Sequence, residues 1–159
     1  MKRILIYGNS GVGKTTLARS KAEAFGLPCL DLDTVAWASP GVREKTDISL
    51  ESIRGFVSEY SEWVIEGCYG GLIQALLADC TELHFLNPGI EASLRNNFAR
   101  AWEPHKYASI EEQDAQLQKL QQWVAEYETR DDEFSYAFHR KLFSDFGGRK
   151  YEYKTLPTY

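Results

Sequence analysis

The sequence is short of cysteine and histidine and has no long apolar run, and each shortage excludes a class of protein. Its three cysteines, Cys29, Cys68 and Cys80, are an odd number without a CxxC pair, and its three histidines show no metal spacing. A disulfide framework and a structural zinc site are therefore not expected. We expect the protein to lie in a reducing, cytoplasmic location. No stretch approaches the roughly 18 apolar residues of a membrane span. The four-residue apolar run near the N-terminus is too short for a signal peptide.

Charge is unevenly distributed, with acids concentrated in one segment. The 159 residues carry a net charge of −5, and residues 103–133 alone hold nine acids and three bases. An acidic run is most often a solvated helix face, and an acidic chain is not typical of a dedicated nucleic-acid-binding protein. The length fits one domain, which we expect to span residues 1–159.

Apolar runs alternate with helical stripes along the chain, a pattern typical of a parallel α/β sheet with helices on both faces. The first run is apolar at every position, as in strands buried on both sides. Residues 38–47 are polar and rich in turn formers, so a loop is expected there. Strands are predicted at 4–7, 29–33, 63–66, 83–86 and 151–156, and helices at 14–25, 50–60, 70–79, 90–101, 109–127 and 131–146.

A phosphate-binding loop follows the first predicted strand. The run Gly8-Asn9-Ser10-Gly11-Val12-Gly13-Lys14-Thr15 matches GxxxxGK[ST]. Its glycines let backbone N–H groups turn inward around an anion, and the helix that begins at Lys14 adds the positive end of its dipole. Lys14 is predicted to reach the β- and γ-phosphates and the Thr15 hydroxyl to bind Mg²⁺. Thr16 belongs to the same nucleotide-binding set.

Two acidic residues are expected to face those phosphates from neighbouring strands. Asp33 ends the second predicted strand and Glu66 ends the third, and ligands of open α/β sheets lie outside the carboxyl ends of the strands. One acid can accept the proton of an acceptor, and one can hold Mg²⁺ through water. A capping or surface role is the alternative for either. Asp31, two residues before Asp33, is a weaker candidate.

Four arginines and one tryptophan complete the set of candidates. Arg95 and Arg100 lie on the helix predicted at 90–101, and either could clamp a transferring phosphoryl group. Five residues apart, they point about 140° apart, so one helix face cannot hold both. Arg130 and Arg140 are weaker candidates, and a surface role is the alternative for all four. Trp37 is predicted to stack on an acceptor or to pack in the core.

Together these residues resemble the small-molecule and nucleoside monophosphate kinases of the P-loop superfamily, the adenylate-kinase-like and shikimate-kinase-like proteins. The likeness is greatest to an uncharacterised branch labelled DNA topology modulation or adenylate-kinase-related proteins. It rests on the P-loop, on Leu32-Asp33 followed by Trp37, and on the run Trp63 to Tyr69, which resembles W-x-I-[DE]-G-x-Y. Specific motifs cover residues 1–102, and the remainder matches loosely.

The resemblance implies a P-loop NTPase three-layer sandwich, with a five-stranded parallel sheet in the order 2-3-1-4-5 and a helical lid within about residues 100–130. It also implies ATP and Mg²⁺ as cofactors. Phosphoryl transfer would go to a small acceptor held near Asp33, Glu66 and Tyr69, with Trp37 beside them. Closure of the lid would exclude water, so that ATP is not simply hydrolysed.

The sequence departs from this family in three respects. Lids of the family are usually rich in arginine, but residues 103–129 contain only Lys106 and Lys119 as bases. The glycine triplet that shikimate kinases carry after the third strand is missing, so shikimate itself is not expected as the acceptor. Relatives usually continue with a helix where this chain reaches Tyr159. The adenine pocket is therefore expected to be more open, or to be lined by residues 131–146.

Three functions remain open at this point, and a phosphotransferase is preferred. In that hypothesis Lys14 and an arginine neutralise charge, Thr15 holds Mg²⁺, and Asp33 orients or deprotonates the acceptor hydroxyl. The alternatives are an ATP-binding switch that regulates a protein partner and, less favoured, a nucleic-acid-associated protein. The acidic segment would favour a cationic or neutral acceptor. The sequence assigns neither the acceptor nor the oligomeric state.

Overall fold

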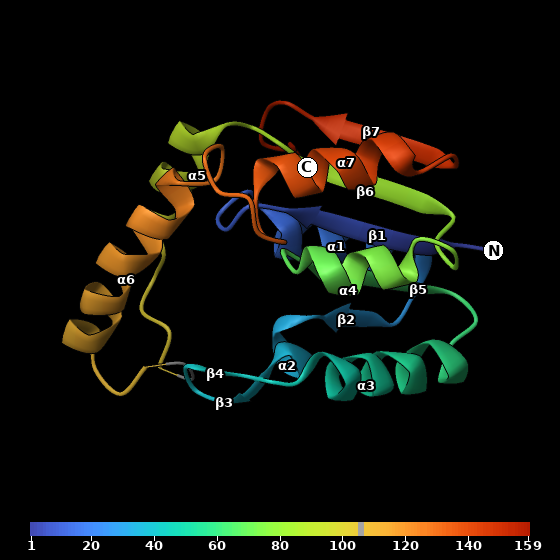
Figure 1. The fold of residues 1–159 in the computed structure, drawn as a ribbon, viewed down its shortest axis with the longest axis horizontal. Helices are drawn as coiled ribbons and strands as arrows, with labels where there is room; N and C mark the ends of the chain where they lie inside the picture. Colours follow the sequence, from blue (N-terminus) through green and yellow to red (C-terminus); the bar gives the residue numbers. More distant parts are fainter. Residues whose placement is uncertain (105–106) are drawn as a thin grey trace.

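A five-stranded parallel sheet forms the middle layer of the computed structural model, which describes residues 1–104 and 107–159 (Figure 1). The strands lie in the order β2-β5-β1-β6-β7, which becomes 2-3-1-4-5 when they are counted along the chain, so the predicted topology is confirmed. They are β1 (Arg3–Gly8), β2 (Cys29–Asp31), β5 (Trp63–Gly67), β6 (Glu82–Leu86) and β7 (Arg149–Tyr153).

Helices cover both faces of the sheet because β1 is apolar on both of its sides. Ile4 and Ile6 pack on one face against α1 (Lys14–Phe25), through side chains such as Leu17. Leu5 and Tyr7 point to the other face. That face is covered by α3 (Thr46–Glu59), α4 (Gly70–Leu76) and α7 (Tyr136–Asp145).

The second strand is shorter than predicted, and a hairpin replaces the predicted loop. β2 ends at Asp31, whose carboxylate accepts the amide N–H of Asp33 at 2.8 Å, an Asx turn that stops the strand. Asp33 therefore opens the short helix α2 (Asp33–Ala36) instead of ending a strand. The antiparallel strands β3 (Trp37–Ser39) and β4 (Val42–Arg43) follow, so much of the segment 38–47 is ordered as a hairpin.

Two boundaries in the C-terminal third also differ from prediction. The helix expected from residue 131 begins at Tyr136, because Ser135 is its N-cap and accepts the N–H of Phe138 at 3.1 Å. The last strand covers 149–153 instead of 151–156, since its register is set by pairing Arg149 with Glu82 of β6.

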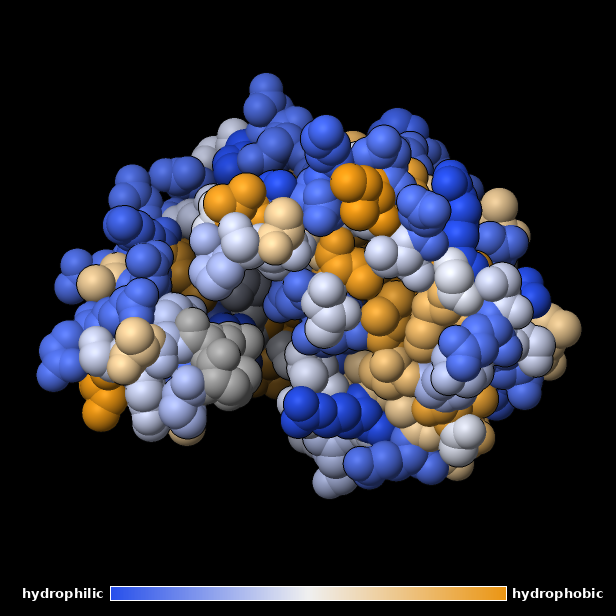
Figure 2. All heavy atoms as spheres, turned by 90° about the horizontal axis from the view of Figure 1, so that it is seen from below, coloured by the Kyte–Doolittle hydropathy of each residue, from blue (hydrophilic) through white to orange (hydrophobic). Residues whose placement is uncertain are grey.

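Two further helices form a lobe beside the carboxyl edge of the sheet, on the left of Figure 1. They are α5 (Ile90–Phe98) and α6 (Ile110–Ala125), which pack against each other. The predicted cap of α6 is confirmed, because the Ser109 hydroxyl accepts the N–H of Glu112 at 3.1 Å. Lys106, one of the two bases counted for the lid, lies outside the described residues. Figure 2 shows the surface hollowed between this lobe and the rest of the molecule.

Within residues 1–104 and 107–159, every helix is too short or too polar to cross a membrane.

Candidate active site

The P-loop joins β1 to α1, and two of its glycines have a left-handed backbone. Gly11 has φ 79° and Gly13 has φ 89°, values that side chains disfavour. A Cβ atom on Gly11 would lie 2.5 Å from the Ser93 carbonyl oxygen and 2.7 Å from the Asn97 amide nitrogen, whereas one on Gly13 would meet nothing within 4 Å. Gly11 thus permits the close approach of α5 to the loop.

Side-chain amides tie the loop to the α5–α6 lobe. The buried Asn9 donates from Nδ2 to the Val124 carbonyl at the end of α6, at 3.2 Å, while its Oδ1 accepts the N–H of Ser10 at 2.9 Å. On α5, Asn96 donates to the Gly11 carbonyl at 2.7 Å. Two hydrogen bonds therefore link the P-loop to the lobe, one to α6 and one to α5. No pattern in the sequence distinguished Asn96 from the other polar residues of the predicted helix.

The remaining loop residues divide between core and surface. Ser10 also donates from its hydroxyl to Oδ1 of Asn97 at 3.4 Å. Val12 is buried against the sheet face that α1 covers, and Thr16 is exposed in the first turn of α1. The Lys14 ammonium folds back over the loop and donates to the Asn9 carbonyl at 2.7 Å. Backbone amides, an ammonium and a helix N-terminus thus meet at one place.

A buried carboxylate lies next to the loop. Glu66 is only 3% exposed, and its Oε1 accepts the hydroxyl hydrogen of Thr15 at 2.7 Å. Burial raises the pKa of Glu66, the charge of Lys14 opposes that rise, and the nearby Asp31 and Asp33 add to it. The two residues predicted to share Mg²⁺, Thr15 and Glu66, are therefore brought into direct contact.

The residues predicted to hold an acceptor form a hydrogen-bonded chain. The indole N–H of Trp37 donates to the Tyr69 hydroxyl at 2.8 Å, and that hydroxyl donates to Oδ1 of Asp33. Burial, followed by the charges of Cys68 and Asp33, raises the pKa of Tyr69, so its hydroxyl stays protonated and remains a donor. Trp37 is 42% exposed, so the alternative of core packing is wrong, and its stacking on an acceptor stays a prediction.

An arginine that was not among the predicted site residues packs against the hydrogen-bonded residues Trp37 and Tyr69. The guanidinium carbon of Arg43, at the end of the hairpin, is 4.6 Å from the ring centre of Tyr69 and 5.5 Å from those of Trp37 and Phe134. Its segment was predicted to be a loop, and the contact with Phe134 spans 91 residues of sequence. No local pattern could have found it.

A buried histidine also connects three segments around the site. His139 Nε2 lies 2.9 Å from the Cys68 carbonyl, so this nitrogen carries the hydrogen, and Nδ1 accepts the Tyr127 hydroxyl at 2.7 Å. The hydroxyl of Tyr7, next to the P-loop, donates to the His139 carbonyl at 3.0 Å. Burial lowers the pKa of His139 to about 4, so the ring is neutral near pH 7.

The four candidate arginines have different surroundings. Arg95 is exposed on α5, whereas Arg100 lies beyond the end of that helix at Phe98, so the prediction that one helix carries both is wrong. Arg130 donates to the Trp123 and Phe134 carbonyls. The fourth, Arg140, pairs with Glu152 through two bonds of 2.5 and 3.1 Å. The last two guanidinium groups thus hold the fold together.

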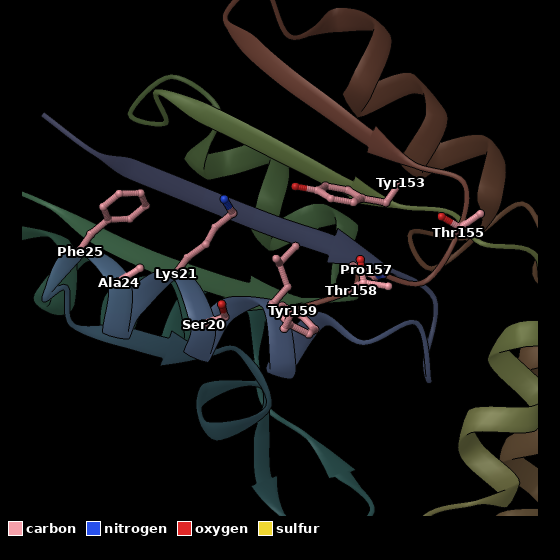
Figure 3. Close-up of a pocket in the computed structure, with 10 residues that line it drawn as sticks. Ser20, Lys21, Ala24, Phe25, Tyr153, Thr155, Pro157, Thr158 and Tyr159 are labelled. Carbon is pink, nitrogen blue, oxygen red and sulfur yellow. The ribbon is translucent and has the colours of Figure 1, made fainter.

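A separate cavity of about 460 Å³ lies between α1 and the segment after β7 (Figure 3). Its lining includes Lys21 and Phe25 of α1 and Tyr153 and Tyr159 from the C-terminal part of the chain. None of the residues predicted to bind phosphate, metal or acceptor lines it. This cavity is therefore separate from the P-loop and from the carboxylates of Asp31, Asp33 and Glu66.

Comparison with protein families gives a match to the N-terminal part of the chain. A model of the ATPase family associated with various cellular activities (AAA) matches residues 4–63. Those residues run from β1 through the P-loop and α3 to the first residue of β5. No curated protein matches the sequence.

Solved structures resemble the whole chain. A gluconokinase from Sinorhizobium meliloti 1021 has a TM-score of 0.55 at 17% identity, covering 95% of this chain and 82% of its own. A shikimate kinase from Aquifex aeolicus has 0.51 at 17%, covering 96% and 86%. A deoxyadenosine kinase from M. mycoides, with bound dATP, has 0.51 at 9%, covering 98% and 92%.

This is the fold of the P-loop small-molecule kinases. At such identities the likeness establishes the P-loop kinase fold alone. The label of DNA topology modulation gains no support from these three proteins and stays a prediction.

Proposed function

We propose that this chain is an ATP- and Mg²⁺-dependent phosphotransferase that acts on a small-molecule acceptor, as a single domain with a lid within residues 100–130. The observation that carries the proposal is the position of Glu66. Its buried carboxylate accepts a hydrogen bond from Thr15 of the P-loop, and the charges of Lys14, Asp31 and Asp33 all act on its pKa. Groups suited to phosphate, metal and acceptor thus adjoin one another.

Residues 8–16 would bind the nucleotide phosphates. Backbone N–H groups of the loop and the N-terminus of α1 supply positive potential. The Lys14 ammonium would leave the Asn9 carbonyl, which it now contacts, and bond to the β- and γ-phosphates. Because the carbonyl is a neutral acceptor and the phosphates are anionic, the exchange is favourable.

The Thr15–Glu66 pair fits Mg²⁺. This ion binds proteins through one or two oxygen ligands and takes the rest from phosphates and water, and the pair offers a hydroxyl and a carboxylate whose oxygens are 2.7 Å apart. Bound Mg²⁺ would neutralise charge developing on the phosphates. Glu66 would contact the ion directly or through a water molecule.

The acceptor would lie beside the Trp37–Tyr69–Asp33 chain. One oxygen of Asp33 accepts the Tyr69 hydroxyl, which holds the carboxylate in place and leaves its second oxygen to orient or deprotonate the acceptor hydroxyl. Arg95 and Arg100 would clamp the transferred phosphoryl group. We assign them this role because Arg130 is already bonded within the fold.

The proposal is tested by ATP consumption with Mg²⁺ across nucleosides, nucleoside monophosphates, sugars and small hydroxy acids. Wild type and Lys14→Ala are compared, with thermal melting to show that both are folded. Turnover that one acceptor class stimulates, and that Lys14→Ala abolishes, supports a kinase. Turnover retained by Lys14→Ala refutes the assigned role of the loop. Tight ATP binding that no acceptor stimulates favours a regulatory switch.

A further inference from the structure

Arg43 presents a preoriented cation beside the proposed acceptor position. Three aromatic rings, those of Trp37, Tyr69 and Phe134, surround its guanidinium carbon at 4.6 to 5.5 Å. Within residues 1–104 and 107–159, no carboxylate lies within 4.0 Å of its nitrogens. The rings thus hold the side chain in place without neutralising its charge.

The way in which Arg43 is held determines what it can bind. Stacking uses the faces of the planar guanidinium and leaves the N–H groups at its edge able to donate. Two parallel N–H groups match the two oxygens of a carboxylate or phosphate. A cationic ligand is disfavoured here, because Arg43 already occupies the aromatic faces that would attract it.

Arg43 and Asp33 contact the same tyrosine from different sides. The guanidinium lies over the Tyr69 ring, and the Tyr69 hydroxyl donates to Asp33. A molecule that spans this one ring can therefore reach both groups. Its hydroxyl would meet the free oxygen of Asp33 while an anionic group at its other end meets Arg43.

We propose that the acceptor carries an oxyanion, a carboxylate or a phosphate, which Arg43 binds while Asp33 takes the hydroxyl to be phosphorylated. This inference rests on the proposed function and narrows its acceptor class. It also opposes the cationic or neutral acceptor that the acidic segment 103–133 favours. Six of the nine acids of that segment lie between residues 103 and 128, around α6, and three lie in the turn before α7, whereas Arg43 adjoins Tyr69 directly.

The inference is tested by calorimetric binding with matched compounds. Sorbitol, gluconate and sorbitol 6-phosphate share one carbon chain and differ in the terminal group, and adenosine and AMP form a second series. A non-hydrolysable ATP analogue with Mg²⁺ fills the P-loop, so that anions do not bind there. The variants are Arg43→Met, which keeps the stacking surface, Arg43→Lys, which keeps the charge, and Arg54→Met, an exposed arginine of α3 as control.

We expect an anionic compound to bind wild type about 10- to 100-fold more tightly than its neutral counterpart, as a bidentate charged pair allows. Arg43→Met should abolish the preference, Arg43→Lys should retain part of it, and Arg54→Met should leave it unchanged. Comparing the affinity for gluconate with that for sorbitol 6-phosphate shows whether Arg43 prefers a carboxylate or a phosphate.

Equal binding of neutral and anionic compounds, a preference that survives Arg43→Met, or no binding of any anionic compound would overturn the inference. ATP turnover is then measured with the same compounds. Anion binding through Arg43 without turnover of any compound would support an anion site at Arg43 but would count against the phosphotransferase proposal, and with it against the role of the bound compound as an acceptor. Turnover with a neutral acceptor alone would support the phosphotransferase proposal and overturn the inference that the acceptor carries an oxyanion.

Discussion

Substituting alanine for Gly11 and, separately, for Gly13 tests how closely α5 approaches the P-loop. Both glycines have positive φ, 79° and 89°, so both variants incur backbone strain. Only Gly11 is also crowded, with the Ser93 carbonyl oxygen 2.5 Å from the position of a Cβ atom, while the corresponding position at Gly13 is open. Comparing the two variants therefore separates the cost of backbone strain from the cost of the steric clash with α5.

The expected magnitudes follow from these two terms. Left-handed backbone costs an alanine about 1–2 kcal/mol, and one kcal/mol lowers the Tm of a domain of this size by roughly 2–4 °C. Gly13→Ala should thus lower the Tm by about 2–8 °C. Gly11→Ala adds about 1–3 kcal/mol for overpacking against a backbone carbonyl that cannot rotate away, which lowers its Tm by a further 2–12 °C or so.

The assay is thermal melting followed by circular dichroism, without nucleotide, so that folding alone is measured. Urea unfolding at 25 °C provides a second measure of the same free-energy difference. If Gly11→Ala melts at or above the temperature of Gly13→Ala, α5 does not pack on the loop as described.

Three other variants test the surroundings of the site. Glu66→Gln should raise the Tm at pH 7, because burial raises the pKa of this carboxyl and so disfavours its charged form in the folded state. The gain should vanish below about pH 4.5, where the unfolded carboxyl is protonated as well, and a lower Tm at pH 7 would contradict it. With its pKa lowered to about 4, His139 makes wild type lose stability as the pH falls from about 6.5 toward 4, since the unfolded imidazole takes up a proton first. His139→Gln should flatten that slope in melting curves, and an unchanged slope would be evidence against a buried neutral ring. Arg130→Lys should lower the Tm by a few degrees without weakening ATP binding in calorimetry, because lysine cannot donate to both carbonyls in the same geometry. Weaker ATP binding would assign Arg130 to the phosphate clamp after all.

The sequence by itself determined the P-loop and the alternation of strands and helices, whereas the order of the strands was predicted from the resemblance to a kinase family. β1, α1 and the loop between them depend on interactions within a few residues, namely apolar runs, glycine backbone freedom and the helix stop at Gly26. The placement of Glu66 also followed, since the carboxyl ends of parallel strands meet at one edge. The roles assigned to these residues stay predictions.

Only the tertiary structure decided which side chains complete the site. Asp33 opens a helix instead of ending a strand because Asp31 bonds to its amide, a choice between two local structures that the pattern left balanced. Arg43 reaches Phe134 and His139 reaches Cys68 across 91 and 71 residues of sequence. Such contacts depend on how the faces of helices and sheet pack together. Burial and pairing across the fold determine them, and neither is encoded in neighbouring residues.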